Sequence, residues 1–486
     1  MKAAFLKEQK RYARAELIEL LGGSDECLAN AIRRLKEFGI LKIVRSSDAQ
    51  MAMSDLAEED VGIVDTGSDA DLYYIVTFVG LVVVGGYVLK CYPKYLADDS
   101  HPTEKLAQVL KVLEKYNARE QVVRMFSETV KESRLNLLTV MRFLIRDYYE
   151  HGAYTNSQVV IETNGSGEIN WDRTISDTFA LLVHGRPHYV DLRTKRRLDD
   201  ERDFFKRLHE SVLTKFTREL QEADLLTLLD IPGVEVSDEA LDALGDTDYL
   251  LYRIECELGT QFNTRKQLVL KVLQAYLSQR VTLGELDGFS VFGSNSFELV
   301  WQNVCSSVIG NHLARPISGL PLPTRSQSGY SGTSTLKSII DKPKWTGKDE
   351  AGDFTHTSAK TLDPDLAVIL VVDGKHQLVI IDAKYYTIQL HRDKKLVGQP
   401  GIGDVTKQYL YQLAFRAFTQ SLGITDVRNC FLMPTDEPDI VDLGYTSLGM
   451  LSRLKLENIQ IRLLPAGEMY DLYLQGKLMD IARLRL

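Results

Sequence analysis

Residues 362–386 read LDPDLAVILVVDGKHQLVIIDAKYY, and they decide the fold of the C-terminal part of the chain. Two runs rich in β-branched residues, 366–372 and 377–384, flank the dipeptide Asp373-Gly374. An Asp-Gly pair between two such runs is typical of a tight hairpin turn, because both turn positions need a positive φ. The segment therefore predicts two antiparallel strands.

The length of the turn determines which residues face each other across this hairpin. A two-residue loop, 373–374, places Asp365 opposite Asp382, whereas a four-residue loop, 373–376, places Asp365 opposite Lys384. Asp382 and Lys384 are two residues apart and share a face of their strand, and directly opposed residues also share a face. Either even-length loop therefore groups the three side chains, and an odd-length loop would separate them.

Two carboxylates and a lysine form the grouping that phosphodiester hydrolysis requires. We expect Asp365 and Asp382 to bind Mg²⁺ or Mn²⁺, because carboxylate oxygens are the ligands that these cations prefer. Such a metal generates hydroxide and stabilises the charge that develops on the phosphate. Lys384 would orient the water or stabilise the same charge.

This pattern resembles the PD-(D/E)xK nuclease superfamily, with Pro364-Asp365 as the first element and Asp382-Ala383-Lys384 as the second. A lone Asp-x-Lys is common by chance, but both elements on one hairpin are much rarer. The resemblance implies a C-terminal α/β domain of the restriction-endonuclease type and DNA as its substrate.

The same resemblance implies two helices beside the strands. Glu298, in the helix expected at 296–309, is the candidate for a further metal contact, or it is an ordinary surface residue. The helix expected at 403–418 carries Lys407 and Gln408, which would face DNA and the catalytic site, or would only form a solvated helix face.

The N-terminal segment, 1–50, is similar to a winged helix. Apolar periodicity predicts a helix over 13–21, a break at two glycines, a second helix that Gly39 ends, and a strand over 40–44. The second helix carries basic residues on one face, namely Arg33, Arg34 and Lys36. They would contact DNA, or the segment would be a small packing or protein-contact module.

The remaining boundaries follow from changes in composition. Residues 51–71 are polar and acidic and are expected to form a linker, and 72–285 a middle domain of mixed α and β structure that opens with a β-meander over 73–95. Residues 286–486 would form the nuclease domain, with an insertion near 310–363. The expected fold class is therefore α+β multidomain.

Composition favours an ordinary water-soluble chain. It has 486 residues, a net charge of −9, a pI of about 5.6 and five scattered cysteines, so we expect a cytoplasmic protein with free thiols and no membrane span. The acidic balance argues against nucleic-acid binding by the whole surface, but a basic groove can coexist with an acidic exterior.

Three further segments sharpen the resemblance: FVGLVVVGGYVLKCYPKY at 78–95, GSGEINWDRTI at 165–175 and FELVWQNVCSSVIGN at 297–311. Together they resemble the LlaJI family of restriction endonuclease subunits, which is related to McrC. The likeness runs from about residue 73 to the C-terminus and leaves the role of the winged-helix-like segment open.

That resemblance implies a partner, a hexameric AAA+ GTPase of the McrB type that the nuclease subunit stimulates. The contact would involve Trp171, Asp172 and Arg173, unless these residues only anchor their own domain. The chain has no GxxxxGK(S/T) loop, so GTP would enter only through the partner.

The sequence therefore favours a metal-dependent DNA endonuclease subunit of a GTP-dependent restriction or phage-defence system. Two alternatives stay open: a winged-helix DNA-binding regulator with a degenerate nuclease domain, and an adaptor that mainly activates a GTPase.

Overall fold

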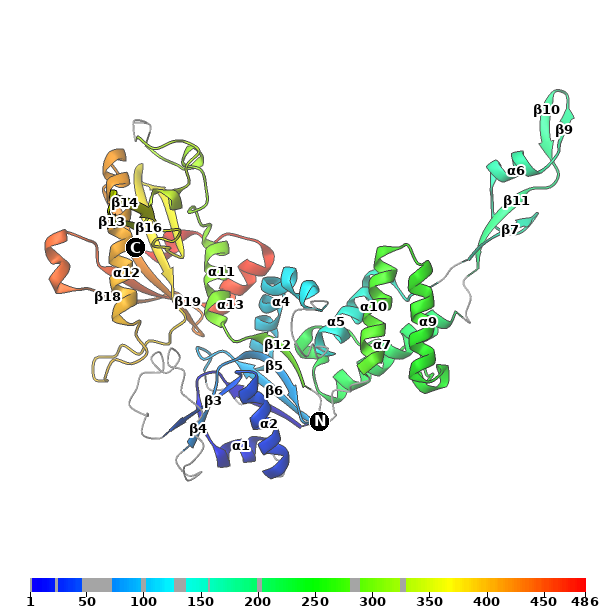
Figure 1. The fold of residues 1–486 in the computed structure, drawn as a ribbon, viewed down its shortest axis with the longest axis horizontal. Coiled ribbons are helices and arrows are strands. Elements are labelled where there is room, and N and C mark those ends of the chain that lie inside the picture. Colours follow the sequence, from blue (N-terminus) through cyan, green and yellow to red (C-terminus); the bar gives the residue numbers. More distant parts are fainter. Residues whose placement is uncertain are drawn as a thin grey trace. The chain divides into compact units, whose positions relative to one another are not determined.

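The computed structural model describes residues 2–21, 25–45, 72–97, 102–125, 137–155, 158–198, 203–279, 289–323 and 329–486. The chain is a mixed α/β protein with two compact units (Figure 1). Unit 1 spans residues 125–291, and unit 2 combines residues 2–124 with 292–486. The expected linker, 51–71, lies outside the described residues.

Unit 2 opens with two helices and a small antiparallel sheet. Helix α1 (Arg14–Leu21) and helix α2 (Asp25–Glu37) precede strand β3 (Leu41–Arg45), in the order that the sequence predicts. Helix α2 ends at Gly39, whose positive φ lets the next amide, that of Ile40, reach back to the carbonyl of Leu35. The sheet has the order β2-β4-β3, with β2 at Arg11–Ala13 and β4 at Leu72–Val76.

The prediction of a β-meander over 73–95 is wrong for its first strand. Strand β4 pairs with β2 and β3, while β5 (Val79–Val84) and β6 (Tyr87–Tyr92) form a hairpin in a different sheet. That second sheet has the order β1-β6-β5-β12, where β1 (Lys2–Lys7) runs parallel to β6. Strand β1 is not predicted from the sequence, because KAAFLK lacks the clean alternation of a half-buried strand.

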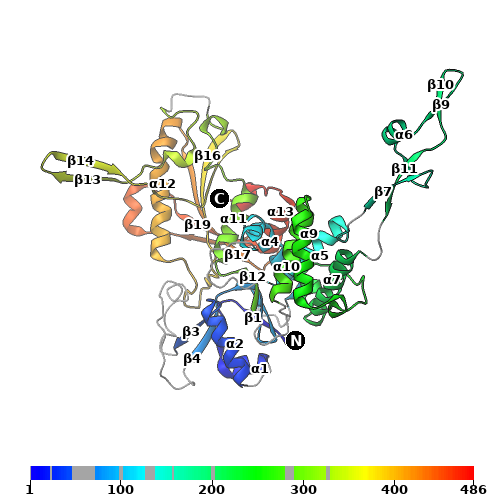
Figure 2. The ribbon, with the colours of Figure 1, turned by 45° about the vertical axis from the view of Figure 1, so that its right-hand side comes forward.

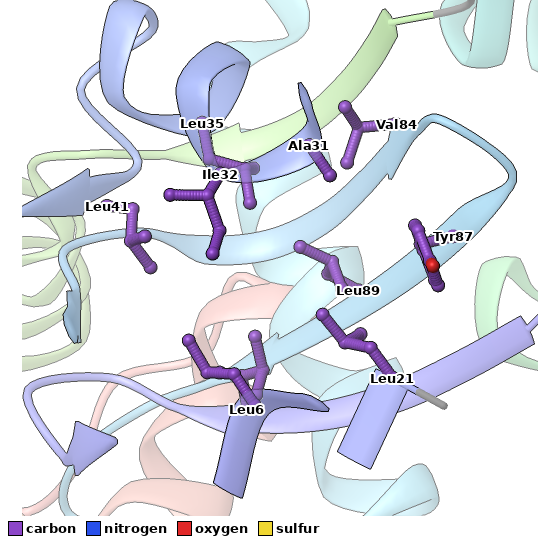
Figure 3. A pocket seen from close by; sticks show the side chains of 10 residues that line it. Leu6, Leu21, Ala31, Ile32, Leu35, Leu41, Val84, Tyr87 and Leu89 are labelled. Carbon is purple, nitrogen blue, oxygen red and sulfur yellow. The ribbon is translucent and has the colours of Figure 1, made fainter. Parts of the chain in front are cut away.

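The two N-terminal helices and the second sheet share one apolar core (Figure 3). A cavity of about 10 Å³ remains between them, which is too small to matter for ligands. It is lined by Leu6, Leu17, Leu21, Ala31, Ile32, Leu35, Leu41, Val84, Tyr87 and Leu89. The N-terminal segment is therefore packed into unit 2 rather than attached to it by a tether.

The C-terminal part of unit 2 is built on a five-stranded sheet of order β15-β16-β17-β19-β18. Strands β16, β17 and β19 are parallel, and the edge strands β15 and β18 are antiparallel. The strands are β15 (Leu366–Val372), β16 (Lys375–Ala383), β17 (Asp426–Thr435), β18 (Val441–Thr446) and β19 (Ile459–Pro465).

Three helices pack against this sheet or against each other. Helix α12 (Ile402–Leu422) covers the face that carries Ile380 and Phe431. Asp382 lies two residues beyond Ile380, so it rises from the same face as the helix. Helix α11 (Phe297–Ile309) packs against β16 and against α13 (Ala466–Gln475).

The segment expected as an insertion, near 310–363, contributes to the core as well as to the surface. Leu313, Ile317 and Leu336 are buried in the cluster beneath α12. The ribbon of β13 (Lys344–Asp349) and β14 (Gly352–Thr357) is exposed along both strands, and Figure 2 shows it projecting from the sheet. Residues 324–328 lie outside the described part of this segment.

Unit 1 combines a group of helices with short strands. Its longer helices are α5 (Leu137–His151), α7 (Phe204–Glu222), α9 (Thr247–Thr260) and α10 (Thr264–Gln279). Buried Asp147 joins α5 to α10 through Arg265, with 2.6 Å between the charged atoms. The strands and the short helix between them are β7 (Gln158–Thr163), β8 (Glu168–Ile169), α6 (Trp171–Asp177), β9 (Ala180–Val183), β10 (Arg186–Tyr189) and β11 (Arg193–Leu198).

Among the residues that the structure describes, no helix combines the length and the apolar character that crossing a membrane requires.

The close approach of Gly80 to β12 (Phe289–Ser294) predicts that this position does not accept a side chain. A Cβ atom at Gly80 would lie 2.2 Å from the carbonyl oxygen of Phe292 and 2.6 Å from the Cα of Gly293. Gly80→Ala should therefore lower the free energy of unfolding by about 1–3 kcal/mol, measured by urea denaturation. Gly403→Ala is the matched control, since that position has open space and lies in the first turn of α12. Equal urea midpoints for the two variants would contradict the packing described here.

Candidate active site

The hairpin of β15 and β16 positions the first carboxylate of the site. Val372 pairs with Lys375, so the loop has two residues, and both of them have positive φ, 49° at Asp373 and 75° at Gly374. Leu366 pairs with Ile381, and one step further along the ladder Asp365 faces Asp382. This confirms the two-residue loop and excludes the four-residue alternative.

Asp365 is held against the end of β16 by the backbone. Its Oδ2 accepts a hydrogen bond of 2.8 Å from the amide of Ala383, the residue between Asp382 and Lys384. The carbonyl of the same aspartate accepts a hydrogen bond of 2.9 Å from Asn311, which also fixes the start of β15. These two hydrogen bonds fix both the backbone and the carboxylate of Asp365 beside the end of β16.

Lys384 lies between two carboxylates. Its Nζ is 3.0 Å from Oδ2 of Asp382 and 2.8 Å from Oδ1 of Asp404. Tyr386 donates a hydrogen bond of 3.3 Å to the other oxygen of Asp404. The lysine side chain is only 16% exposed, so its position is well defined by these contacts.

Asp404 lies in the first turn of α12 and is one of the polar residues at helical spacing along the helix expected at 403–418. The sequence assigns it no role, because its contact with Lys384 arises only when α12 packs on the sheet.

The electrostatics of the site are those of a crowded acidic pair. Burial raises the pKa of Asp365, and the hydrogen bond to Asp382 and the charge of Asp382 raise it further. The amide of Ala383 and the charge of Lys384 oppose this increase without cancelling it. Without a cation the two carboxylates therefore favour holding a proton between them.

For Lys384, the neighbouring charges outweigh the effect of burial on its pKa. Burial alone would lower its pKa, but the charge of Asp382 and the hydrogen bond and charge of Asp404 outweigh burial and raise it. The ammonium group therefore stays protonated at neutral pH, which suits it to stabilising negative charge rather than to accepting a proton.

The donor set of the pair fits a divalent cation. Asp365 and Asp382 offer hard oxygen ligands, and their mutual repulsion is what a bound cation would relieve. Across the described ranges, however, no three His, Cys, Asp or Glu side chains come together as a metal-holding group.

Glu298 is not brought to this pair. It is exposed in the first turn of α11, and its charge acts on Glu8 and Lys94. Gln408 is fully buried under the sheet, where its Nε2 lies 3.4 Å from the carbonyl oxygens of Ile380 and Cys430. Lys407 is exposed on the same helix.

The basic residues predicted to contact DNA lie on α2. Arg33 and Lys36 are exposed and, with Arg14, line a groove of about 480 Å³. Arg34 is half-buried and less exposed than Arg33 and Lys36. The other lining residues of the groove are Ala29, Ile32, Glu37, Ile43 and Tyr74.

The residues predicted to contact a partner form the first turn of α6 in unit 1. Trp171, Asp172 and Arg173 are all exposed, and the Oδ1 of Asn170 caps the helix by accepting from the amide of Arg173. Arg173 also pairs with Asp177 at 3.5 Å.

The chain is thus a mixed α/β protein that carries an acidic pair and a lysine on one hairpin. A model of the LlaJI restriction endonuclease family matches residues 78–327 and 329–456, and the chain belongs to this family. This confirms the resemblance identified from the sequence and makes the chain a restriction-system protein.

A curated relative is the type II restriction enzyme BsuMI component YdjA of Bacillus subtilis (strain 168). It is 25% identical over 425 residues, which cover 86% of this chain and 84% of the relative.

Among solved structures, the chain is similar to one from a half-complex of Thermococcus gammatolerans McrB AAA+ hexamers with bound McrC. The sequences are 12% identical, the match covers 98% of this chain and 99% of the other, and the TM-score is 0.35. A second match is to the McrBC complex of the same organism, with 14% identity, 59% and 82% coverage and a TM-score of 0.24.

The crowded carboxylates predict a pH-dependent penalty. The pKa of Asp365 is raised in the folded state, so Asp365 destabilises the metal-free protein at pH values above its ordinary pKa of 3.8. The loss of folding free energy grows as the pH rises from there toward the raised pKa. Asp365→Asn should therefore increase the free energy of unfolding by about 1–3 kcal/mol at pH 7.5.

The measurement is thermal unfolding with a chelator present, at pH 7.5 and again near pH 4. Toward pH 4 the carboxyl of the unfolded state begins to bind a proton as well, while that of the folded state is already protonated, so the advantage of the variant should shrink. An Asn variant that is no more stable than the wild type at pH 7.5 would show that the pair is not repulsive.

Proposed function

We propose that this chain is a metal-dependent DNA endonuclease of the PD-(D/E)xK type, with Asp365, Asp382 and Lys384 as its catalytic centre. The observation that carries the proposal is the register of the β15–β16 hairpin, which opposes the two carboxylates and leaves Lys384 beside them. Membership of a restriction endonuclease family supports DNA as the substrate.

Asp365 and Asp382 would hold Mg²⁺ or Mn²⁺. A divalent cation bound there supplies an acidified water and neutralises charge on the scissile phosphate. The chain contributes the rest: the amide of Ala383 orients Asp365, and Lys384 presents a protonated amine at the same edge of the sheet. That amine stabilises the charge that develops on the phosphate oxygens.

Asp404 is a positioning residue in this proposal. It holds the Nζ of Lys384 at 2.8 Å and accepts from Tyr386, so that the lysine does not collapse fully onto Asp382. Gln408 supports the same strands from below through the carbonyls of β16 and β17. Glu298 would bind the metal only if the first turn of α11 faced Asp365 and Asp382.

We further infer that the N-terminal helices and their small sheet act as a winged-helix DNA contact. Two arginines and a lysine along one groove support this, since phosphate contacts come mainly from such side chains. Arg34 and exposed Lys407 would add to the contact surface.

The nuclease proposal is tested by plasmid cleavage with Mg²⁺ or Mn²⁺. Asp382→Ala should reduce cleavage at least a hundredfold, because both a metal ligand and a partner of Lys384 are lost. Asp373→Asn is the control, since it lies at the far end of the same hairpin and Asn tolerates its positive φ. Equal cleavage by wild type and Asp382→Ala would refute the site.

A second part of the proposal concerns a partner, an AAA+ GTPase of the McrB type, which the sequence resemblance to McrC-like proteins suggests. The exposed apolar surface around α6 favours a protein contact there: Trp171 is 53% exposed, Phe179 98% and Leu182 75%. In this arrangement GTP is hydrolysed by the partner alone.

Changing the α6 turn should separate partner contact from DNA hydrolysis. Trp171→Ala with Arg173→Glu should reduce stimulation of the neighbouring GTPase at least tenfold, as expected when an aromatic and arginine anchor is removed. Trp345→Ala is the control, because this tryptophan is 70% exposed on the ribbon of unit 2. GTP hydrolysis that responds equally to both variants would place the contact elsewhere.

A further inference from the structure

A buried glutamate, Glu8, contacts the segment that follows β16 and carries Lys384. Glu8 follows β1, is 7% exposed, and has its backbone fixed by an amide hydrogen bond of 2.9 Å to the carbonyl of Tyr92. A carboxylate in such a place costs free energy unless its oxygens are satisfied.

The carboxylate of Glu8 is satisfied by two segments that are distant in sequence. Its Oε2 accepts hydrogen bonds from the hydroxyl of Tyr385, at 2.5 Å, and from the amide of Lys94, at 3.2 Å. Burial raises the pKa of Glu8, while the charge of Lys94 and the hydroxyl of Tyr385 oppose that shift.

The ring of Tyr385 also contacts a lysine and two aromatic side chains. The Nζ of Lys94 lies 4.4 Å from the centre of the Tyr385 ring, within the range of a cation–π contact. Tyr95 meets the ring edge-on at 6.2 Å, and Phe297 packs on it at 5.2 Å. The side chain therefore has one position.

Tyr385 is the residue after Lys384, and the two side chains leave the backbone on opposite sides. Lys384 and Tyr386 both contact Asp404, whereas Tyr385 points to Glu8. The amide of Lys384 also donates to the carbonyl of Leu432, at 2.8 Å. The backbone that carries the lysine is thus held from both sides.

We propose that Glu8, acting through the hydroxyl of Tyr385, is a positioning residue for Lys384, so that the N-terminal strand is part of the nuclease machinery. The inference rests on the proposed function of Asp365, Asp382 and Lys384. It assigns a role to a residue some 377 positions away in sequence from its partner, and it requires no ligand beyond those already proposed.

The test measures single-turnover cleavage and DNA affinity with the full chain, and with its GTPase and GTP if cleavage needs them. Tyr385→Phe should lower the cleavage rate about tenfold and leave DNA affinity unchanged, because a small displacement of a catalytic group is costly. Glu8→Leu should act similarly, and the double variant should be no slower than the slower single variant. Glu8→Gln should restore most of the rate, since its amide oxygen can accept from the same hydroxyl.

The matched control is Tyr473→Phe, which removes the hydroxyl of another buried tyrosine of unit 2, one that donates to Asn303 at 2.9 Å. Its cleavage rate should equal that of the wild type, whatever its loss of thermal stability. Equal rates for Tyr385→Phe and Tyr473→Phe would overturn the inference, as would additive losses in the double variant. Because Asp382→Ala is measured in the same assay, failure of this inference is distinguishable from failure of the nuclease proposal.

Discussion

The register of one hairpin underlies everything else at the catalytic end of the chain. Asp373 and Gly374 adopt positive φ, so the loop has two residues and every pair along β15 and β16 is set. A slip of one residue would send Asp365 to the opposite face from Asp382 and Lys384. The chemistry of the site is therefore specified by a turn at the other end of the strands.

The site itself is a compromise between stability and function. The half-buried carboxylate of Asp365 lies beside the buried carboxylate of Asp382, and Lys384 is shared between Asp382 and Asp404. A protein selected only for stability would separate these charges or replace one of them. Their position together at the strand ends favours a functional role for the unfavourable contacts.

Sequence reasoning succeeded where structure is local. The hairpin follows from a turn dipeptide and two β-rich runs, and the helices at 14–21 and 25–37 follow from periodicity and glycine breaks. It failed where a partner must be chosen at a distance. Strand β4 is expected from the sequence to start a meander but pairs with β2 and β3, and the contact of Asp404 with Lys384 depends on how α12 packs on the sheet. Glu298 is expected at the metal site from the superfamily resemblance, yet its charge acts on Glu8 and Lys94, because the orientation of α11 is set by its core residues rather than by its polar ones.

Unit 2 is discontinuous, and this affects how the chain can be made. Unit 2 is complete only when residues 292–486 have been synthesised and can pack with residues 2–124. Unit 1 is one continuous stretch between these two segments. During synthesis, unit 1 can fold first while the early strands remain without their final neighbours. The proposed nuclease site therefore forms only after nearly the whole chain has left the ribosome.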